Sequence, residues 1–342
     1  MPEAIIGSGS TASAIRSKKA KWHYCPQLPI GVSPLFNRPF QPLAILKWFI
    51  GGWLPLSENL VVLGLAVLSW FYFHPTLEQC RELSFDWIGL IWIRNLVLMF
   101  LVAGGLHLYF YGFKRQGDDR HYDARPMARN NRVFTFNNQV LDNMFWSCAS
   151  GVTIWTAYET LMMWALANGY APGLSWSEDA GWVILLVFLI PIWETLYFYL
   201  IHRLIHWPPL YRTVHYLHHR NINVGPWSGL SMHPVEHIIY MGSALIHFVV
   251  PANPLLIIYH LQHYTLTAAT THTGYQGIVV KDKLRLSLGT FHHQMHHRFF
   301  ECNYGGLEIP CDKWAGSFHD GTVESHQEFL NKRKLNAERA NA

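Results

Sequence analysis

Charged residues are scarce in this chain, and several familiar sequence signals are missing from it. Only 14% of the 342 residues are charged, and the net charge at neutral pH is +4. So small and dispersed a charge argues against binding to nucleic acid. No apolar core precedes a cleavage site within Met1–Lys21, so we expect no secretory signal peptide. The cysteines show no Cys-x-x-Cys spacing and are expected to be reduced: Cys25, Cys80, Cys148, Cys302 and Cys311.

Hydrophobic residues, in contrast, are abundant. They make up 50% of the chain, which includes 15 Trp, 16 Tyr and 20 Phe. This composition is typical of a protein that is partly surrounded by lipid. Four apolar stretches have about the 17–25 residues that a membrane-crossing helix needs: Leu56–Phe73, Trp87–Tyr111, Phe145–Ala167 and Gly181–Leu200. The sequence therefore predicts an all-α, integral membrane helical bundle with about four spans.

Basic residues are distributed unevenly between the segments that flank these stretches. The segment Gly112–Met144 is rich in Lys and Arg, and so is the N-terminal tail, with Arg16, Lys18, Lys19 and Lys21. The loop His74–Asp86 has one basic residue and the loop Asn168–Ala180 has none. The positive-inside rule therefore predicts that both termini and Gly112–Met144 are cytoplasmic. The last span then emerges into the cytoplasm.

Histidines are concentrated directly after that span. Of 21 histidines, 15 lie between His202 and His297. Eight of these form three clusters whose i,i+3 and i,i+4 spacings place side chains on one helix face: His202/His206, His215/His218/His219 and His293/His296/His297. One metal rarely takes more than about four such ligands, so the clusters predict two metal ions. We expect His272 as a ninth ligand, because the Gly-Tyr turn after it can direct it back toward the site.

The clusters also suggest how the chain is divided. We expect a cytoplasmic N-terminal tail at 1–42, transmembrane helices at 43–200, a cytoplasmic, histidine-rich helical cap at 201–320 that binds two metals, and a C-terminal tail at 321–342. Within the cap, two apolar stretches at 235–270 flank Pro251-Ala252-Asn253-Pro254. This pattern predicts a membrane-associated helical hairpin, re-entrant or lying against the membrane. A hairpin returns the chain to the side that it left, and so keeps the second and third clusters together.

The residue types near the clusters narrow the chemistry. No Asp or Glu lies at ligand spacing within the clusters, which argues against a carboxylate-bridged di-iron bundle, and no His-Glu-x-x-His zinc motif occurs. Iron held by imidazoles alone would offer a route from O₂ to an unactivated C–H bond. Two other functions stay open: a membrane zinc metallohydrolase with Glu236 or Glu301 as its base, and a non-enzymatic metal transporter or sensor. Whether His233, His237 or His263 also binds metal is open too.

Three ionisable residues within the predicted spans call for an explanation, because charges inside a membrane are costly. Glu194 lies two turns before His202, about 12 Å away along a helix, so we expect it to support the site indirectly or to pair helices. We expect Glu159 to have a structural partner. Arg94 lies close enough to the start of its span to extend toward the outer interface.

The three clusters, in their order and separations, resemble the histidine boxes of the fatty acid hydroxylase/sterol desaturase superfamily of membrane di-iron oxygenases. The resemblance extends over Ile192–Gly321. It includes Leu210-Tyr211-Arg212, His233-Pro234-Val235-Glu236, His272-Thr273-Gly274-Tyr275 and Asn303-Tyr304-Gly305. One motif departs from the family, which often has Trp-Asp before two variable residues and an aromatic-Gly pair. Here Cys311 replaces the first aromatic residue, so we expect an effect on local packing or substrate fit rather than on metal binding.

The resemblance implies an O₂-dependent lipid hydroxylase or desaturase with two iron ions, acting on a sterol or fatty-acyl type of membrane lipid. The implied iron ligands are His202, His206, His215, His218, His219, His272, His293, His296 and His297. No His-Pro-Gly-Gly signature of a fused cytochrome b5 is present. We therefore expect a separate cytochrome b5-, ferredoxin- or reductase-like electron donor. Such an enzyme would lie in the endoplasmic reticulum of a eukaryote or the inner membrane of a bacterium, with its site facing the cytoplasm.

Overall fold

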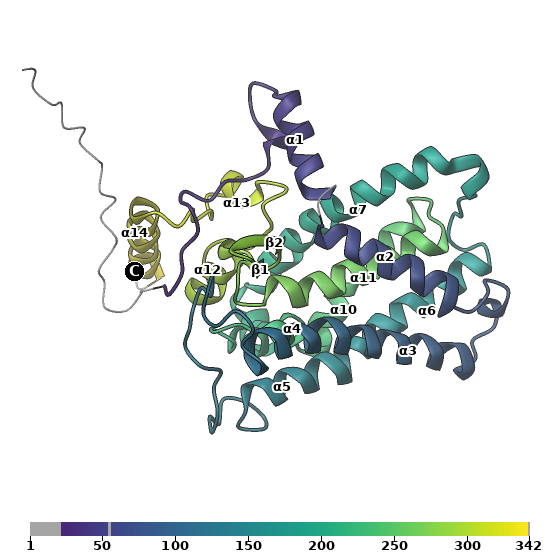
Figure 1. Cartoon of the computed structure of the whole chain (residues 1–342), viewed down its shortest axis with the longest axis horizontal. Coiled ribbons are helices and arrows are strands. Elements are labelled where there is room, and N and C mark those ends of the chain that lie inside the picture. Colours follow the sequence, from purple (N-terminus) through teal and green to yellow (C-terminus); the bar gives the residue numbers. More distant parts are fainter. Residues whose placement is uncertain (1–21, 54–55, 341–342) are drawn as a thin grey trace, which may run out of the picture.

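Long helices lie side by side in the body of the protein, and the segments rich in histidine lie at one end of them (Figure 1). The computed structural model describes residues 22–53 and 56–340. The basic residues expected in the N-terminal tail, Arg16 to Lys21, lie outside the described residues. Residues 22–41 of that tail pack on the cap, where the Ile30 amide donates to the Asp320 carbonyl at 3.0 Å.

Seven helices form the first part of the bundle, and π-helical turns follow three of them, α3, α4 and α5. The helices are α1 (Pro42–Trp53), α2 (Glu58–Tyr72), α3 (Phe85–Met99), α4 (Gly105–His107), α5 (Gln139–Trp146), α6 (Thr153–Ala167) and α7 (Trp176–Ile205), and the π-helical turns are η3 (Phe100–Gly104), η4 (Leu108–Gly112) and η5 (Ser147–Val152). Side chains that accept from free amides of the first turn mark the starts of α2, α3 and α5: Ser57, Ser84 and Asn138.

The number of spans differs from the prediction. Among the described residues, two helices are long and apolar enough to cross a membrane, Phe85–Gly112 and Trp176–Ile205. The pair α1 and α2, bent by 52° at its break, would be a third if it formed one span. About four spans is therefore too many by length and composition. The predicted span Phe145–Ala167 is not among the candidates, because α6 places polar residues such as Thr156 and Glu159 along its length.

A buried ion pair joins α3 to α6. The Arg94 guanidinium donates to the Glu159 carboxylate at 2.5 Å, and Asn95 bonds to both side chains. Arg94 is only 6% exposed, so the expectation that it extends toward the outer interface is wrong. Breaking a buried pair by removing one partner costs about 3–5 kcal/mol. The pair therefore ties these two helices together.

The hairpin expected at 235–270 enters the bundle. It consists of α10 (Pro234–Met241), the 3-10 helix η8 (Gly242–Phe248) and α11 (Pro254–Thr271). At its tip, the Leu174 amide donates to the Ala252 carbonyl at 3.1 Å, so the turn lies beside the loop that precedes α7. Most of α11 is buried, in contact with α2, α6 and α7. Neighbouring helices therefore cover α11, although it carries polar residues such as His260 and Gln262.

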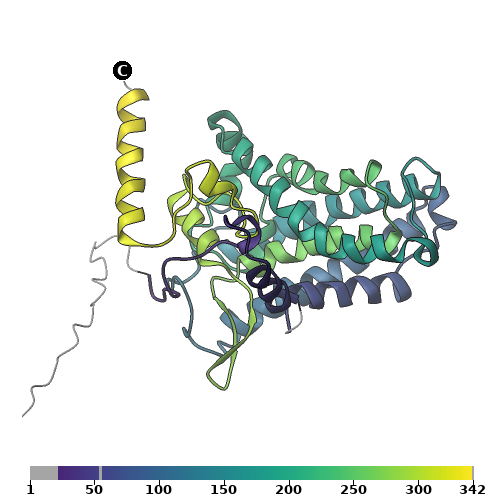
Figure 2. The ribbon, with the colours of Figure 1, turned by 90° about the horizontal axis from the view of Figure 1, so that it is seen from above.

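Short elements form the cap. They are η1 (Pro34–Phe36), α8 (Pro208–Leu210), η6 (Tyr211–His215), α9 (Tyr216–His219), η7 (Pro226–Leu230), β1 (Gly277–Val280), β2 (Lys283–Ser287), α12 (Phe291–Phe299) and α13 (Cys311–Trp314), while η2 (Gln79–Arg81) lies between α2 and α3. The antiparallel hairpin β1–β2 is the one departure from an all-α fold among the described residues. Most of the expected C-terminal tail is the helix α14 (Val323–Ala340), which projects away from the bundle (Figure 2).

The connecting segments fall into two groups at opposite ends of the bundle. The basic segment Gly112–Met144 lies at the histidine end, where the Tyr122 amide donates to the Gly274 carbonyl at 2.9 Å. At the other end, Asn168 donates to the Arg81 carbonyl at 3.1 Å and so joins the two loops that are poor in basic residues. The segment that is rich in basic residues and the two loops that are poor in them therefore lie at opposite ends of the bundle.

Candidate metal centre

Helix ends bring the predicted histidines together. His202 lies in the last turn of α7, and His206 is the residue that ends this helix. Pro208 and Pro209 begin the next helical turn, because proline fits the first positions of a helix but cannot continue one. Thr290 begins α12 by accepting from the His293 amide at 3.3 Å. Each cluster therefore approaches the site from a helix whose start or end is defined locally.

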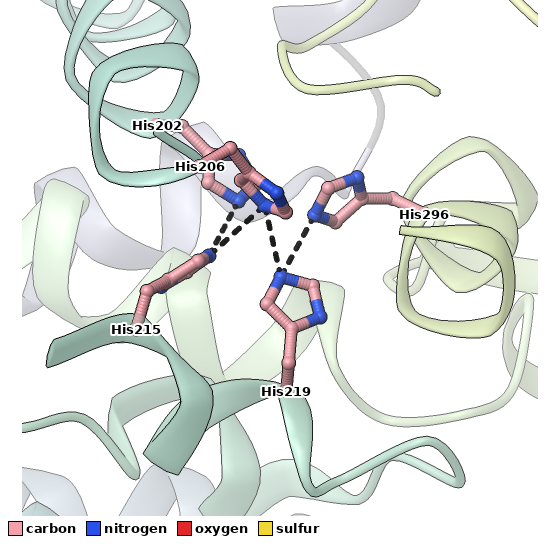
Figure 3. Close-up of side chains that lie close together, drawn as sticks. All are labelled: His202, His206, His215, His219 and His296. Carbon is pink, nitrogen blue, oxygen red and sulfur yellow. Dashed lines mark hydrogen bonds between the residues drawn. The ribbon is translucent and has the colours of Figure 1, made fainter. Parts of the chain in front are cut away.

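Five histidines form a first histidine group (Figure 3): His202, His206, His215, His219 and His296. One ring nitrogen from each lies within 4.8 Å of those of the others. The Nε2 atom of His215 is 3.1 Å from that of His202 and 3.1 Å from that of His206. The Nε2 atom of His219 is 3.1 Å from those of His206 and His296. The rings point toward one shared space between α7, η6, α9 and α12.

Four more histidines form a second histidine group: His218, His272, His293 and His297. Their ring nitrogens also lie within 4.8 Å of one another. The Nε2 atom of His272 is 3.0 Å from those of His293 and His297. The two groups are neighbours, since the ring centroids of His219 and His297 are 4.9 Å apart.

The structure places each of the nine predicted ligands in one of these groups, but the groups do not follow the sequence clusters. The second cluster divides between them, with His218 in one and His219 in the other. Consecutive residues on a helix point about 100° apart, so adjacent histidines can serve two different sites. Among the described residues, neither group includes a carboxylate or a thiolate.

The three histidines that the sequence left open lie outside both groups. His233 precedes α10 and accepts from the Val235 amide. Both ring nitrogens of His237 have partners, the Ser150 hydroxyl at 2.6 Å and the Leu230 carbonyl at 3.1 Å. His263 contacts Glu194 and Asn59. All three therefore have roles in packing or hydrogen bonding away from the two groups.

The hydrogen bonds at the far side of the rings decide which nitrogen carries the proton. Nδ1 contacts a backbone carbonyl in four rings: His202 to Tyr304 at 2.6 Å, His296 to Cys302 at 2.6 Å, His272 to Ala268 at 2.7 Å and His297 to Asn221 at 3.0 Å. A carbonyl can only accept, so Nδ1 is the donor and Nε2 of the neutral ring carries a lone pair. His272 and His297 therefore face each other with lone pairs and share no proton. A cation between them would resolve this conflict.

Burial keeps these rings neutral. It lowers the pKa of His272 to about 4. Burial, with repulsion from neighbouring imidazoles as the next cause, also holds the pKa values of His219 and His297 well below the ordinary histidine range. Metal binding requires the unprotonated ring. The two groups are therefore in the protonation state that suits a metal at neutral pH.

Two acidic residues hold parts of the site in place. The Nδ1 atom of His215 donates to the buried carboxylate of Glu236 at 2.7 Å. Asp312 accepts from the amides of Tyr304 at 3.0 Å and Gly305 at 2.7 Å, and so positions the carbonyl that orients His202. The sequence analysis named Glu236 as a possible base and as part of a family motif, but it assigned no role to Asp312. The backbone carbonyls that accept from the histidine rings could not be predicted from the sequence, because no side chain marks them.

A cavity of about 590 Å³ leads to both groups. Its walls near α1 and α7 are apolar and aromatic, with Trp48, Trp53, Phe188, Ile192 and Phe198. Its inner end is lined by His202, His215, His218, His272 and His293. This volume lies within the range of about 300–1,000 Å³ that is typical of small-molecule sites. An apolar molecule in this cavity would reach the histidines.

Comparisons with known proteins agree with this arrangement. The sequence model of the family described as fatty acid hydroxylase matches residues 187–317. A Delta(7)-sterol 5(6)-desaturase of Gibberella zeae is 30% identical over 139 residues, which are 40% of this chain and 42% of that protein. The corresponding enzyme of Saccharomyces cerevisiae is 31% identical over 125 residues, 35% of this chain and 32% of that protein.

One relative aligns over a longer region. A Delta(7)-sterol-C5(6)-desaturase of Nicotiana tabacum is 24% identical over 250 residues, which are 68% of this chain and 84% of that protein. The alignments with the two fungal proteins, in contrast, span less than half of their length. No solved structure matches the chain. The region that matches the fatty acid hydroxylase model contains the nine histidines of the two groups, and over this region the chain is similar to that family and to sterol desaturases.

Proposed function

We propose that this protein is a membrane-bound lipid hydroxylase or desaturase. It uses two iron ions held by the two histidine groups, O₂ as co-substrate and electrons from a separate donor protein. The observation that carries the proposal is the set of Nε2 lone pairs that face each other at 3.0–3.1 Å without protons to share. Bound iron would supply the oxidising power toward a C–H bond that side chains lack.

The residues of the chain would hold and orient both metal and lipid. Backbone carbonyls and Glu236 fix the ring orientations, so that the lone pairs of both groups converge. The aromatic walls of the cavity exclude water and hold an apolar molecule against the inner histidines. The names of the relatives, sterol desaturases, support a lipid substrate of the sterol type.

A metal and lipid analysis tests the proposal. Protein purified in mild detergent should contain two metal ions per chain, with iron as the native metal. Lipid extracts of membranes with and without the protein should differ in one hydroxylated or newly unsaturated product. Two zinc ions with a hydrolysed lipid would favour the metallohydrolase instead. Bound metal without any change in lipids would favour a transporter or sensor, and a single metal per chain would contradict the two-metal site.

We also propose that the histidine end faces the cytoplasm, because the basic segment Gly112–Met144 lies at that end. In a Cys25→Ser background, Ser177→Cys should react with a membrane-impermeant thiol reagent on intact cells. Asp119→Cys should react only after permeabilisation. Both positions are exposed, so access to the reagent decides the result. The reverse pattern would contradict this orientation.

Glu236 offers a test of how the rings are held. Glu236→Ala removes the acceptor of the His215 proton, and losing such a partner typically costs about 10–100-fold in metal affinity. Glu236→Gln keeps an acceptor oxygen at the same place and should have a much smaller effect. The measurement is the dissociation constant for Zn²⁺ in competition with a chelating dye. Equal affinities for the two variants would show that the hydrogen bond does not orient His215.

A further inference from the structure

A polar cluster lies in the wall of the cavity, apart from the histidine groups. It consists of Glu58, Glu194, Glu308 and His263, which all line the cavity. The Nδ1 atom of His263 donates to Oε2 of Glu194 at 2.5 Å. The Thr195 hydroxyl donates to Glu308 at 3.2 Å, and the Thr270 hydroxyl donates to Glu58. A carboxyl group as buried as that of Glu194 is costly in an apolar cavity, and the contacts with His263, Thr195 and Thr270 leave part of the acceptor capacity of the cluster unused.

One acceptor of this cluster has no partner. Glu194 is 4% exposed, yet its Oε1 atom accepts no hydrogen bond from any group in the described part of the chain. The Nε2 atom of His260 is 3.8 Å from this oxygen, which is too far for a hydrogen bond. A buried carboxylate oxygen requires a donor. A ligand in the cavity with an O–H or N–H group would supply it.

The position of Glu194 relates this acceptor to the site of oxidation. Glu194 and His202 lie on the same helix, α7, and both line the same cavity. Eight residues separate them, which corresponds to about 12 Å along the helix axis. A molecule bound to Glu194 at one end would therefore present atoms about 12 Å away to the histidines.

We propose that Glu194, with Glu58 and Glu308 beside it, is a subsite for the polar group of the lipid substrate. This inference rests on the proposed function and adds a substrate class to it: a lipid with a hydrogen-bond donor, a hydroxyl or an amine, about 12 Å from the carbon that is oxidised. A lipid without a donor would leave Glu194 unpaired. Sites built to pair a hydroxyl or amine strongly reject analogues that lack it.

Binding of three probes of equal chain length to the full-length protein tests this subsite. The probes are radiolabelled 1-octadecanol, octadecylamine and 1-methoxyoctadecane, of which the ether has no donor. The wild type should bind the alcohol or the amine at least about 10-fold more tightly than the ether, as expected for a hydrogen bond to a charged group. The tighter-binding probe of the alcohol and the amine shows whether the subsite prefers a hydroxyl or an amine as hydrogen-bond donor. In Glu194→Gln this preference should disappear, because the amide places a donor where the lipid needs an acceptor.

The ether and a matched variant serve as controls. Glu194→Gln should bind the ether at least as tightly as the wild type does, because the amide can donate to the ether oxygen, and this binding shows that the cavity is intact. Glu324→Gln, on the exposed surface of α14, should keep the full preference. Equal affinity of the wild type for all three probes would overturn the subsite. A Glu194→Gln variant that keeps the preference but turns over slowly would also overturn the subsite. Glu194 would then transfer protons during the reaction and would not bind the polar group of the lipid.

Metal content, measured on the same samples, separates this inference from the proposed function. Protein without two metals that still shows a Glu194-dependent preference would contradict the function and keep the subsite. Protein that holds two metals but shows no preference among the probes would support the metal site of the proposed function and contradict the subsite.

Discussion

Replacing His296 or His297 with Ala should abolish formation of the oxidised lipid, and each variant should lose a different metal. The two residues are adjacent in α12 but belong to different histidine groups. Each replacement removes one lone pair from its group and leaves an acceptor, the Cys302 or the Asn221 carbonyl, without its donor. Losing even an outer partner of a metal ligand costs about 10–100-fold. Losing the ligand itself should therefore lower turnover by more than about 100-fold.

The measurement is product formed and metal bound per chain at matched membrane expression. Each variant should retain one metal, because the group that keeps all its histidines is unchanged. His23→Ala, at an exposed position outside both groups, is the control and should keep both metals and full turnover. Full turnover in either α12 variant would contradict the assignment. Loss of both metals from both variants would show that the groups do not bind independently.

The nine site histidines could be named from the sequence because the signal is local. The i,i+3 and i,i+4 spacings depend on helix geometry alone, and the structure places the clusters at the end of α7, in η6 and α9, and in α12. Adding His272 required a longer argument from the Gly-Tyr turn after it. The structure places it at the end of α11, in the second histidine group.

The division into two groups could not be predicted in this way. Which of His218 and His219 belongs with His296 depends on how α9 and α12 cross, which is a tertiary property. The carbonyl acceptors of Tyr304 and Cys302 are equally invisible, because every residue has a carbonyl. Glu236 was noticed, but its role required the distance to His215.

The membrane part was harder to predict for a different reason. Hydropathy finds apolar stretches, but it does not tell a helix surrounded by lipid from one surrounded by protein. The apolar stretches at 235–270 predicted a hairpin that is re-entrant or lies against the membrane. The structure shows that α2, α6 and α7 contact α11, and the association with the membrane stays a prediction. Arg94 looked close enough to the interface to reach it, but its partner, Glu159, is 65 residues away in sequence.

Removing both metals should destabilise the protein strongly, and the cap should lose its structure first. Without a cation, the lone pairs of His272 and His297 face each other at 3.0 Å inside the protein. Binding free energies of structural zinc sites reach about 10–16 kcal/mol, and this energy contributes to folding. Two sites need to contribute only a small part of that to have a large effect. At about 2–4 °C per kcal/mol for domains of 150–250 residues, we expect the unfolding temperature to fall by more than about 10 °C.

Hydrogen exchange should locate the effect. The histidine groups join α7 to η6, α9 and α12, which are short elements. After treatment with a chelator, amides of η6, α9 and α12 should exchange faster, while those of α3 and α6, joined by Arg94 and Glu159, should change little. Adding back iron or zinc should restore both the unfolding temperature and the protection. The contradicting outcome is a metal analysis in which both ions have left while the unfolding temperature and the amide protection stay the same. The histidines would then pack stably without metal, and the lone-pair argument for a bound cation would be wrong.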